Sequence, residues 1–532
     1  MKATYIDYCE TNSFSTTLLS YLSHDERLEP YISNWPTHQN FEALIARKRV
    51  TANRQTLVST LKKQYSDSGY QNGESQLVHK NIDSLLSENT YTITTGHQLN
   101  IFTGPLYFIY KIVTAINLAA ELKAAHPDKN FVPVYWMATE DHDFEEINNI
   151  KVHGKKFTWN EDAKGATGRI DPISIRDTLR AYENTLGFSE NSRTLSALLE
   201  EAYLNHTTLA DATRFLVHHL FSAYGLVILD ADDHQLKREL SAIIKEDILD
   251  QKSFAAISAT SKSLKESGFE TQVHSREINF FYLKDKLRER IVLENDKWKV
   301  LNTNISFQKN ELVAEIENHP ERFSPNVVMR PLYQEVILPN LAYIGGGAEI
   351  VYWLQLKKNF DQYHIDFPLL VLRNSALVTT GSFTNKLDRL KISVKDIFKD
   401  AVVLKKDWVI KHSNHRLNLT DELHDFSSIF EKLKLRAYKI DPTLAPSTEA
   451  VEVRLQKALA NLEKKLIKAE KKNHEEVLTQ IDNLRNKYFP GNGLQERTEN
   501  FGIFYTEHGN LFIDELVRHF KPLDFKFTIL ES

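Results

Sequence analysis

A dense group of carboxylates follows an apolar segment of this chain. Residues 131–138 read FVPVYWMA, and residues 140–146 then read EDHDFEE, with five carboxylates and one histidine. Such a group could bind a divalent ion, act on a proton of an amine, or face solvent as an acidic loop. A permanent metal site is disfavoured because no H-E-x-x-H or comparable ligand spacing is present. We therefore predict a catalytic group that orients an amine or takes its proton, formed by Glu140, Asp141, His142 and Asp143.

A glycine-containing turn forms a second candidate site at residues 94–111, TTGHQLNIFTGPLYFIYK. Glycines at a turn between a strand and a helix let the backbone approach a ligand, and the free N–H groups of a helix start attract anions. The segment matches neither a Walker motif nor G-x-G-x-x-G. The predicted binding residues here are Gly96, His97, Gln98, Gly104, Tyr107 and Lys111.

Two further polar segments follow. Residues 327–356, VVMRPLYQEVILPNLAYIGGGAEIVYWLQL, contain a triple glycine before a predicted helix, which is typical of a backbone nest for an anionic group. Residues 488–505, YFPGNGLQERTENFGIFY, are polar and follow a long helical region, and we expect them to fold back over the core. Gln334 and His274 also stand in polar segments, although a histidine of this kind is more often an ordinary surface or core residue. The predicted binding residues are Arg330, Tyr343, Gly345, Gly346, Gly347, Glu349, Trp353, Gln495, Glu496 and Arg497.

Alternating strands and helices position these residues. Between about 90 and 375, apolar strand-like runs such as TYTIT and FPLLVLR alternate with helical patterns, including a helix predicted at 105–124. This order predicts an α/β fold with a parallel sheet, and the long connections at 160–210 and 285–325 predict insertions. Ligands bind at the carboxyl ends of such strands. We therefore expect TTGHQ, EDHDFEE and the Asp230–Asp233 cluster to converge on one crevice.

The region after about 380 has a different pattern. Apolar residues recur every three or four positions from Leu423 to Ile440. After a proline-containing turn a similar rhythm predicts a second long helix at about 447–487, with a shift of register after Asn473. This predicts an antiparallel helical coiled coil with apolar surface left for a second copy, and hence a homodimer. The predicted domains are 1–378, 379–488 and 489–532.

Composition limits the class of protein. The 532 residues carry 66 basic and 71 acidic side chains, a near balance that argues against a nucleic-acid-binding protein. No apolar run is long enough to span a bilayer, and the N-terminal residues lack the apolar region of a signal peptide. The single cysteine, Cys9, rules out an intrachain disulfide and a cysteine-based zinc site. We therefore expect a cytoplasmic protein without a membrane or nucleic-acid partner.

The motifs in TGHQLNIFTGPLYFIYK, VPVYWMATEDHDFEEIN, RPLYQEVILPNLAYIGGGAEIVYW and FPGNGLQER resemble the BshC family, the cysteine-adding enzymes of bacillithiol biosynthesis. The similarity covers nearly the whole chain in the same order. It implies a Rossmann-like core with inserted connecting segments and a C-terminal coiled coil, similar to class I aminoacyl-tRNA synthetases. It also implies a ligase that joins L-cysteine to glucosaminyl-malate, with ATP or another nucleotide as co-substrate, no tightly bound cofactor and no resident metal.

The resemblance also implies a division of work among the predicted residues. The turn at Gly96 and the start of the following helix would hold an anionic group, and Asp141, His142 and Asp143 would orient the amines and assist deprotonation. Arg330, the glycine run and Arg497 would hold carboxylates. Two alternatives stay open from the residues alone: a metal-dependent nucleotidyltransferase or hydrolase that uses EDHDFEE, and a non-catalytic scaffold built on the coiled coil.

Overall fold

The computed structural model describes residues 1–48, 50–68 and 75–532. These residues divide into two compact units. Unit 1 contains Met1–Cys9, Ser13–Leu377 and Gln495–Leu530, and unit 2 contains Glu10–Asn12, Val378–Leu494 and Glu531–Ser532.

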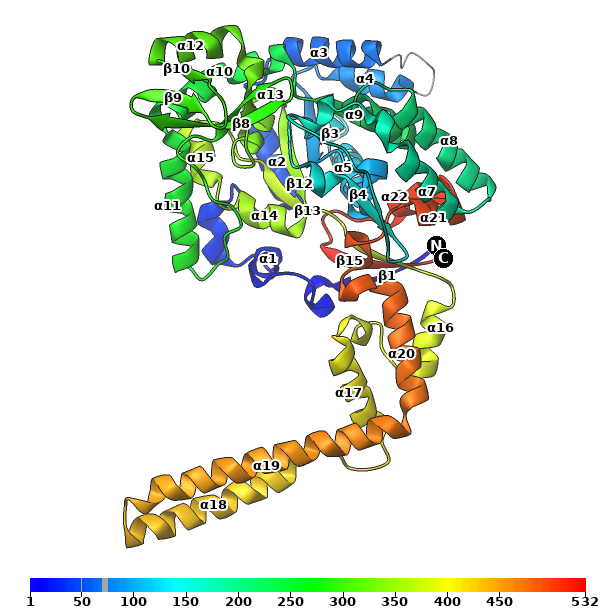
Figure 1. The fold of residues 1–532 in the computed structure, drawn as a ribbon, viewed down its shortest axis with the longest axis vertical. Coiled ribbons are helices and arrows are strands. Elements are labelled where there is room, and N and C mark those ends of the chain that lie inside the picture. Colours follow the sequence, from blue (N-terminus) through cyan, green and yellow to red (C-terminus); the bar gives the residue numbers. More distant parts are fainter. Residues whose placement is uncertain (49, 69–74) are drawn as a thin grey trace. The chain divides into compact units, whose positions relative to one another are not determined.

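A five-stranded, entirely parallel sheet lies at the centre of unit 1 (Figure 1). Its strands are largely buried, as expected where both faces of a parallel sheet are covered, and four of them are mainly apolar while β2 (Thr90–His97, TYTITTGH) is rich in buried threonines. This confirms the α/β fold class predicted from the alternation of strands and helices. The strands, in the order β13-β12-β2-β3-β6, are β13 (Leu369–Leu372), β12 (Asn340–Gly345), β2 (Thr90–His97), β3 (Asn130–Met137) and β6 (Val227–Asp230).

The strand order changes direction between β2 and β12. From β2 the chain moves outward through β3 to β6, and it then returns to β12 on the other side of β2 and continues to β13. Where the connections from two neighbouring parallel strands run in opposite directions, a crevice opens at the carboxyl ends of these two strands. His97 ends β2 and Gly345 ends β12, so two of the predicted polar segments begin at this crevice.

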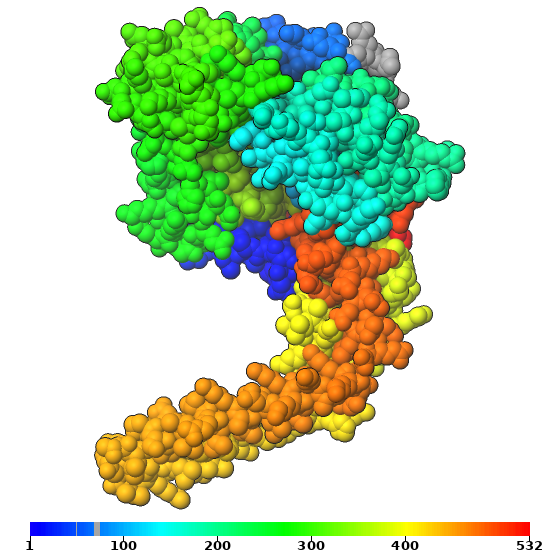
Figure 2. All heavy atoms as spheres, in the orientation of Figure 1, coloured from blue at the N-terminus to red at the C-terminus, as the bar shows by residue number. Residues whose placement is uncertain are grey.

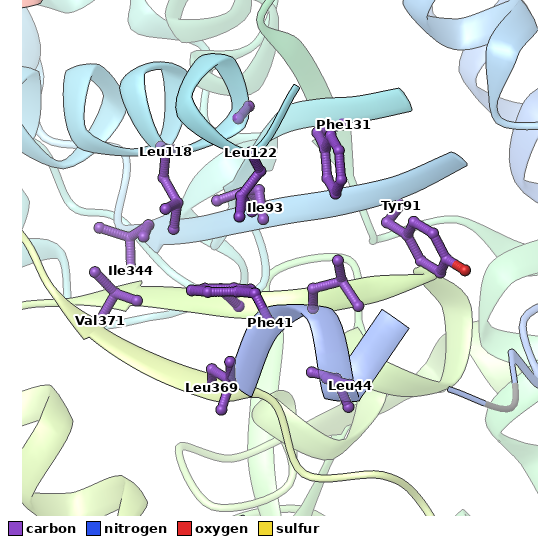
Figure 3. Close-up of a cluster of buried hydrophobic side chains, with 14 residues drawn as sticks. Phe41, Leu44, Tyr91, Ile93, Leu118, Leu122, Phe131, Ile344, Leu369 and Val371 are labelled. Atoms are coloured by element: carbon purple, nitrogen blue, oxygen red, sulfur yellow. The ribbon is translucent and has the colours of Figure 1, made fainter. Parts of the chain in front are cut away.

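A hydrophobic core fastens helices to this sheet. Tyr91 and Ile93, two residues apart on β2, point to one face of the sheet. Figure 3 shows them in a buried cluster with Leu118 and Leu122 and with Phe41 from a second helix. Burial of this apolar surface fixes the strands that carry the polar segments. The two helices are α5 (Tyr107–Ala125) and α2 (His38–Arg47).

The long connections fold as insertions, as predicted. The first insertion holds a hairpin and three helices over 149–221, a longer range than the predicted 160–210. The second holds a five-stranded antiparallel sheet in the order β10-β9-β8-β7-β11 over 280–325, against the predicted 285–325. The elements of the first are β4 (Asn149–Val152), β5 (Lys155–Thr158), α7 (Arg176–Leu186), α8 (Glu190–Leu204) and α9 (Leu209–Phe221). Those of the second are β7 (Phe280–Lys284), β8 (Leu287–Glu294), β9 (Lys297–Val300), β10 (Ser306–Phe307), α12 (Lys309–Asn318) and β11 (Phe323–Pro325).

The other elements of unit 1 surround these sheets. A small sheet in the order β1-β15-β14 brings strands from the two ends of the chain together. Its strands are β1 (Lys2–Asp7), β15 (Lys526–Glu531) and β14 (Ala376–Thr379), of which Val378, Thr379 and Glu531 are assigned to unit 2. The helices are α1 (Thr16–Leu22), α3 (Arg54–Asp67), α4 (Gln76–Ser84), α6 (Phe144–Ile147), α10 (His234–Asp250), α11 (Lys252–Glu266), α13 (Arg330–Ile337), α14 (Gly347–Trp353), α15 (Lys357–Gln362), α21 (Gly502–His508) and α22 (Leu511–His519).

Unit 2 is helical. The predicted coiled coil forms between α18 (Thr420–Ile440) and α19 (Leu444–Asn473), which pack along each other. The single second helix predicted at 447–487 is wrong, because the chain breaks at His474 and continues as α20 (Glu475–Tyr488). The remaining helices are α16 (Phe383–Leu390) and α17 (Ala401–His412).

The helical hairpin leaves apolar side chains uncovered. In the predicted seam Phe430 is buried, whereas Leu433 and Ile440 stay 41% and 80% exposed. The partner helix therefore covers only part of the seam. Among the residues that the structure describes, no helix is both long and apolar enough to cross a membrane.

Candidate active site

A cavity of about 940 Å³ opens at the crevice between β2 and β12. Figure 2 shows unit 1 hollowed between its cyan and green segments, which carry the acidic stretch and the antiparallel sheet. The turn after β2, the acidic stretch after β3 and the glycine run after β12 all reach this cavity. The predicted residues that line it are Gly96, His97, Gln98, Tyr107, Lys111, Asp141, His142, Asp143, Arg330, Tyr343, Gly346, Gly347, Glu349, Trp353 and Arg497. Glu140, Gly104, Gly345, Gln495 and Glu496 are not among the lining residues.

Asp141 is held by two arginines. Arg330 at the start of α13 binds both of its carboxylate oxygens, with Nη1 donating to Oδ2 at 3.1 Å, and Arg288 on β8 lies 3.7 Å away. Burial alone would raise the pKa of Asp141, but the two guanidinium groups outweigh it and lower that pKa. A carboxylate with a lowered pKa is a poor proton acceptor. The geometry therefore favours Asp141 as the residue that positions Arg330 and Arg288, and not as a base.

Glu140 points away from the cavity although it is the neighbour of Asp141. Its carboxylate forms a buried ion pair with Lys237 of α10, and Lys237 Nζ also donates to the carbonyl oxygen of Phe323 at 2.8 Å. Burial raises the pKa of Glu140, with Lys237 opposing the shift. This placement corrects the expectation that Glu140 acts on substrate, because its carboxylate already binds α10.

His142 and Asp143 lie nearer to solvent. Arg288 Nη1 donates to His142 Nδ1 at 2.8 Å, so the neutral ring carries its proton on Nε2. Asp143 Oδ1 lies 3.8 Å from His142 Nε2, and its side chain is 59% exposed. Asp143 is thus the carboxylate of this motif that keeps its oxygens open to a substrate amine.

The predicted anion site at the start of α5 does not form. The N–H of Leu106 donates to the carbonyl oxygen of Glu499 at 2.8 Å, and Asn500 Nδ2 donates to the carbonyl oxygen of Gly104 at 2.7 Å. The segment around Asn500 therefore covers the helix start. Gly104 has φ +66°, and a Cβ at this position would lie 2.6 Å from Asn100 Cβ. This turn therefore requires glycine.

Lys111 of α5 lines the cavity next to the glycine turn that ends β2. Lys111 Nζ donates to the carbonyl oxygen of Gly96 at 2.8 Å and pairs with Glu349 Oε2 at 2.5 Å. Burial lowers the pKa of Lys111, with Glu349 opposing the shift. Lys111 thus ties the end of β2 to α14.

The glycine run after β12 is occupied by its own helix. Gly346 N–H donates to Glu349 Oε2 at 2.7 Å, and Tyr343 Oη donates to Glu349 Oε1 at 2.8 Å. The expected anion nest is therefore filled by a carboxylate of the same chain. Gly345 lies behind the cavity wall, whereas Gly346 and Gly347 reach it.

The polar segment near the C-terminus packs onto the sheet within unit 1. Arg373, which directly follows β13, donates through Nη2 to Glu496 Oε1 at 2.7 Å. The N–H of Ala376 donates to Glu496 Oε2 at 3.0 Å. Gln495 and Glu496 are buried, and Arg497 reaches the cavity. This segment therefore fixes Arg373 at the carboxyl end of the sheet.

His97 stands between these groups. Its ring lies against Tyr107 and Phe108, and its buried Nε2 has no hydrogen-bond partner among the described residues. Burial lowers the pKa of His97 well below 6.5, and the nearby charges of Lys111 and Arg373 add to the shift. His97 is therefore neutral at pH 7.

Because of this pKa shift, protonation of His97 makes the free energy of unfolding depend on pH. Below pH 6.5 the unfolded chain binds a proton at His97 that the folded chain does not, so acid favours unfolding until the folded-state pKa is reached. Between pH 7 and pH 5, we expect the free energy of unfolding to fall less for the His97→Asn protein than for the parent. The difference should be up to about 1.4 kcal/mol per pH unit. Urea unfolding of both proteins at the two pH values measures the difference, and equal losses would contradict the assignment.

The comparisons with known proteins agree with this architecture. The family profile "Bacillithiol biosynthesis BshC, N-terminal Rossmann-like domain" matches residues 1–374, and "Bacillithiol biosynthesis BshC, C-terminal coiled-coil domain" matches residues 376–532. The chain belongs to the BshC family. A relative from Flavobacterium johnsoniae, named "Putative cysteine ligase BshC", is 47% identical over 99% of both chains. Relatives of the same name from Flavobacterium psychrophilum and Christiangramia forsetii are 43% and 41% identical, each over at least 99% of both chains.

A solved structure gives a much weaker similarity. Methionyl-tRNA synthetase from Mycobacterium tuberculosis, bound by methionyl-adenylate, is 11% identical over 80% of this chain and 92% of its own. The TM-score is 0.22, so this similarity carries no argument about the BshC fold or its function.

Several cavity residues of this BshC protein escaped the sequence analysis. Arg288 and Arg290 stand two apart on β8, a spacing that directs both to one face, and Arg373 follows a buried strand as the acidic stretch does. The spacing of Arg288 and Arg290, and the position of Arg373 after a strand, are visible in the sequence and could have identified these residues. Seven cationic side chains and four carboxylates line the cavity, so it attracts anionic ligands. The cations are Lys111, Arg276, Arg288, Arg290, Arg330, Arg373 and Arg497, and the carboxylates are Asp141, Asp143, Glu146 and Glu349.

The third predicted cluster does not join the site. Asp230 accepts a hydrogen bond from Thr139 at 2.5 Å, Asp232 pairs with Arg169, and Asp233 caps α10. Asp230–Asp233 thus support the surrounding loops and are absent from the cavity lining, which corrects the expectation that three strand ends converge. Within the described ranges, no group of three or more His, Cys, Asp or Glu side chains is placed to hold a metal ion.

Proposed function

We propose that this protein is a cytoplasmic ligase that joins the carboxylate of L-cysteine to the amino group of glucosaminyl-malate and so forms bacillithiol. The names of its full-length relatives support cysteine ligation, and the site supports it independently. The observation that carries the proposal is the arginine-rich cavity at the switch point of the sheet, with Asp143 open beside it. Such a site suits an anionic amine substrate, because glucosaminyl-malate carries two carboxylates and one amine.

The chemistry requires an activated cysteine. A carboxylate is a poor electrophile, so we propose that ATP or another nucleotide serves as a co-substrate, with no tightly bound cofactor. The cysteine carboxylate displaces pyrophosphate from the nucleotide, and the amine then attacks the acyl carbon and expels the nucleoside monophosphate. Asp143 takes the proton of the amine, while Arg288 and Arg330 bind carboxylates of the malyl group.

The decisive test is a thiol product assay. Purified protein is mixed with L-cysteine, glucosaminyl-malate and ATP, and each component is left out in turn. We expect bacillithiol only in the complete mixture, together with one equivalent of AMP. Product without a nucleotide would exclude the activation step, and no product in any mixture would contradict the ligase proposal.

We also propose that the helical hairpin of unit 2 forms a homodimer. Ile429, Leu435 and Tyr438 are 54%, 61% and 58% exposed on α18, and Val453 is 44% exposed on α19. Large apolar side chains left exposed on a helical hairpin favour an interaction site, and a second copy presents the same side chains.

Light scattering at tens of micromolar tests this interface. We expect the parent to have twice the mass of one chain, and Leu435→Glu with Tyr438→Glu to have the mass of one chain, because buried glutamates would oppose association. Leu511→Glu is the matched control, since Leu511 is 65% exposed on α22 in unit 1. A parent that scatters as a monomer would contradict the proposal.

A further inference from the structure

The floor of the cavity holds polar atoms that the protein leaves without a partner. Gln334 and Arg373 are 2% and 4% exposed, and both line the cavity. Gln334 Oε1, Arg373 Nε and His97 Nε2 have no hydrogen-bond partner among the described residues. A buried polar atom left unpaired destabilises the fold, so three of them in the floor of one cavity indicate a ligand that supplies the missing partners.

These atoms lie around one small region. A Cβ on Gly96 would lie 3.3 Å from the Gln334 amide nitrogen and 3.8 Å from Tyr343 Oη, and Tyr343 Oη bonds Glu349. A Cβ on Gly346 would lie 3.3 Å from Glu349 Oε2 and 3.8 Å from Arg373 Nε. The Gln334 amide and the Arg373 guanidinium therefore both lie near the Glu349 carboxylate.

The two kinds of unpaired atom define the ligand. Arg373 Nε donates from a cation and matches a carboxylate, whereas Gln334 Oε1 accepts and matches an ammonium group. The charges of the floor balance, because Lys111 pairs with Glu349 and Arg373 pairs with Glu496. A floor without net charge suits a ligand without net charge, and an α-amino acid carries one carboxylate and one ammonium group.

A second group of lining side chains, which we call the arginine wall, has a different charge. It contains Arg276, Arg288, Arg290 and Arg330 together with Asp141 and Asp143, and it adjoins the floor because Arg330 lies one helical turn before Gln334 on α13. An excess of positive charge suits a dianion and not a zwitterion. The two halves of the cavity therefore differ in the class of ligand that each one fits.

We propose that the floor formed by His97, Gln334, Glu349 and Arg373 is an α-amino-acid subsite, which receives the zwitterion of cysteine while the arginine wall receives the dianionic amine substrate. This assignment of cysteine rests on the proposed function. Arg373 Nε binds the carboxylate, and Gln334 Oε1 binds the ammonium group. The ring of His97 stays neutral and adds no positive charge to the floor.

Binding of matched thiols to the unaltered protein tests the subsite without turnover. Isothermal titration compares L-cysteine with cysteamine, which lacks the carboxylate, and with 3-mercaptopropionate, which lacks the amine. We expect L-cysteine to bind at least about tenfold more tightly than either analogue, because each analogue leaves one buried polar group unpaired. An analogue that binds as tightly as L-cysteine, or no binding of L-cysteine at millimolar concentration, would overturn the proposal.

Two variants then separate the halves of the cavity. Gln334→Met keeps the volume of the side chain and removes its acceptor, so we expect the KM for L-cysteine to rise about tenfold with the KM for glucosaminyl-malate unchanged. Arg290→Gln in the arginine wall should show the reverse pattern. A Gln334→Met protein with an altered KM for glucosaminyl-malate alone would place cysteine elsewhere.

The outcomes distinguish this proposal from the ligase proposal. If the parent prefers L-cysteine to both analogues but forms no bacillithiol in the complete mixture, the subsite stands and the ligase proposal fails. If bacillithiol forms while the analogues bind as tightly as L-cysteine, the ligase proposal stands and the subsite fails.

Discussion

Replacing Asp141 by asparagine should cut turnover by about 100-fold and destabilise the fold by about 3 kcal/mol. Asp141 binds Arg330 through both oxygens and lies 3.7 Å from Arg288. Asparagine keeps the shape but removes the charge, so two guanidinium groups lose their counter-ion in a largely buried place. Displacement of these guanidinium groups would misplace an anionic substrate. Small misplacements of a substrate at an active site lower turnover by about this factor. Bacillithiol formation and urea unfolding measure the two effects.

Asp143→Asn is the matched control for this prediction. Asp143 is two residues away, and its side chain is 59% exposed against 15% for Asp141. Its substitution should leave stability within about 0.5 kcal/mol, as is usual for surface positions. Turnover should still fall by about 100-fold if Asp143 is the proton acceptor. An Asp141→Asn protein that unfolds like the parent and keeps normal activity would show that the motif is only a solvated loop.

Lys237→Met should have the largest effect on stability, a loss of about 3–5 kcal/mol. The side chains of Lys237 and Glu140 are 0% and 7% exposed, and they bind each other. Methionine fills most of the space, but it leaves the Glu140 carboxylate buried without its cation. Urea unfolding at pH 7 measures the loss.

The double variant Lys237→Met with Glu140→Leu shows whether the loss comes from the unpaired charge. Replacing both partners by apolar groups of similar volume is often neutral or stabilising, so the double variant should recover most of the stability. If it is as unstable as Lys237→Met alone, the loss comes from packing around α10 and not from the charge of Glu140.

The fold could be predicted because its cause is local. Most of the sheet strands are apolar runs, β2 alternates threonine with tyrosine and isoleucine, and α5 repeats apolar residues at helical spacing, so burial of each element follows from its own sequence. Predicted and observed ends of α5 agree within two residues, 105–124 against Tyr107–Ala125. The break at His474 was missed because the polar pattern around it is also compatible with a continuous helix.

The candidate site could be predicted only as a set of strand ends. Residues that follow β2, β3 and β12 do line one cavity, because carboxyl ends of parallel strands meet at one edge of a sheet. The same rule wrongly included Asp230–Asp233, whose side chains bind Thr139, Arg169 and α10. Proximity to a strand end places a backbone but does not set the direction of a side chain.

The sequence by itself determined the α/β class, the coiled coil, the family resemblance and the segments that reach the crevice. Only the tertiary structure decided that Asp141 binds Arg330 while its neighbour Glu140 binds Lys237. It also decided that Glu499 and Asn500 cover the start of α5, where an anion was expected. These partners come from elements nearly one hundred to several hundred positions away. Hydrogen bonds and ion pairs depend on where such distant elements pack, and no local periodicity encodes that arrangement.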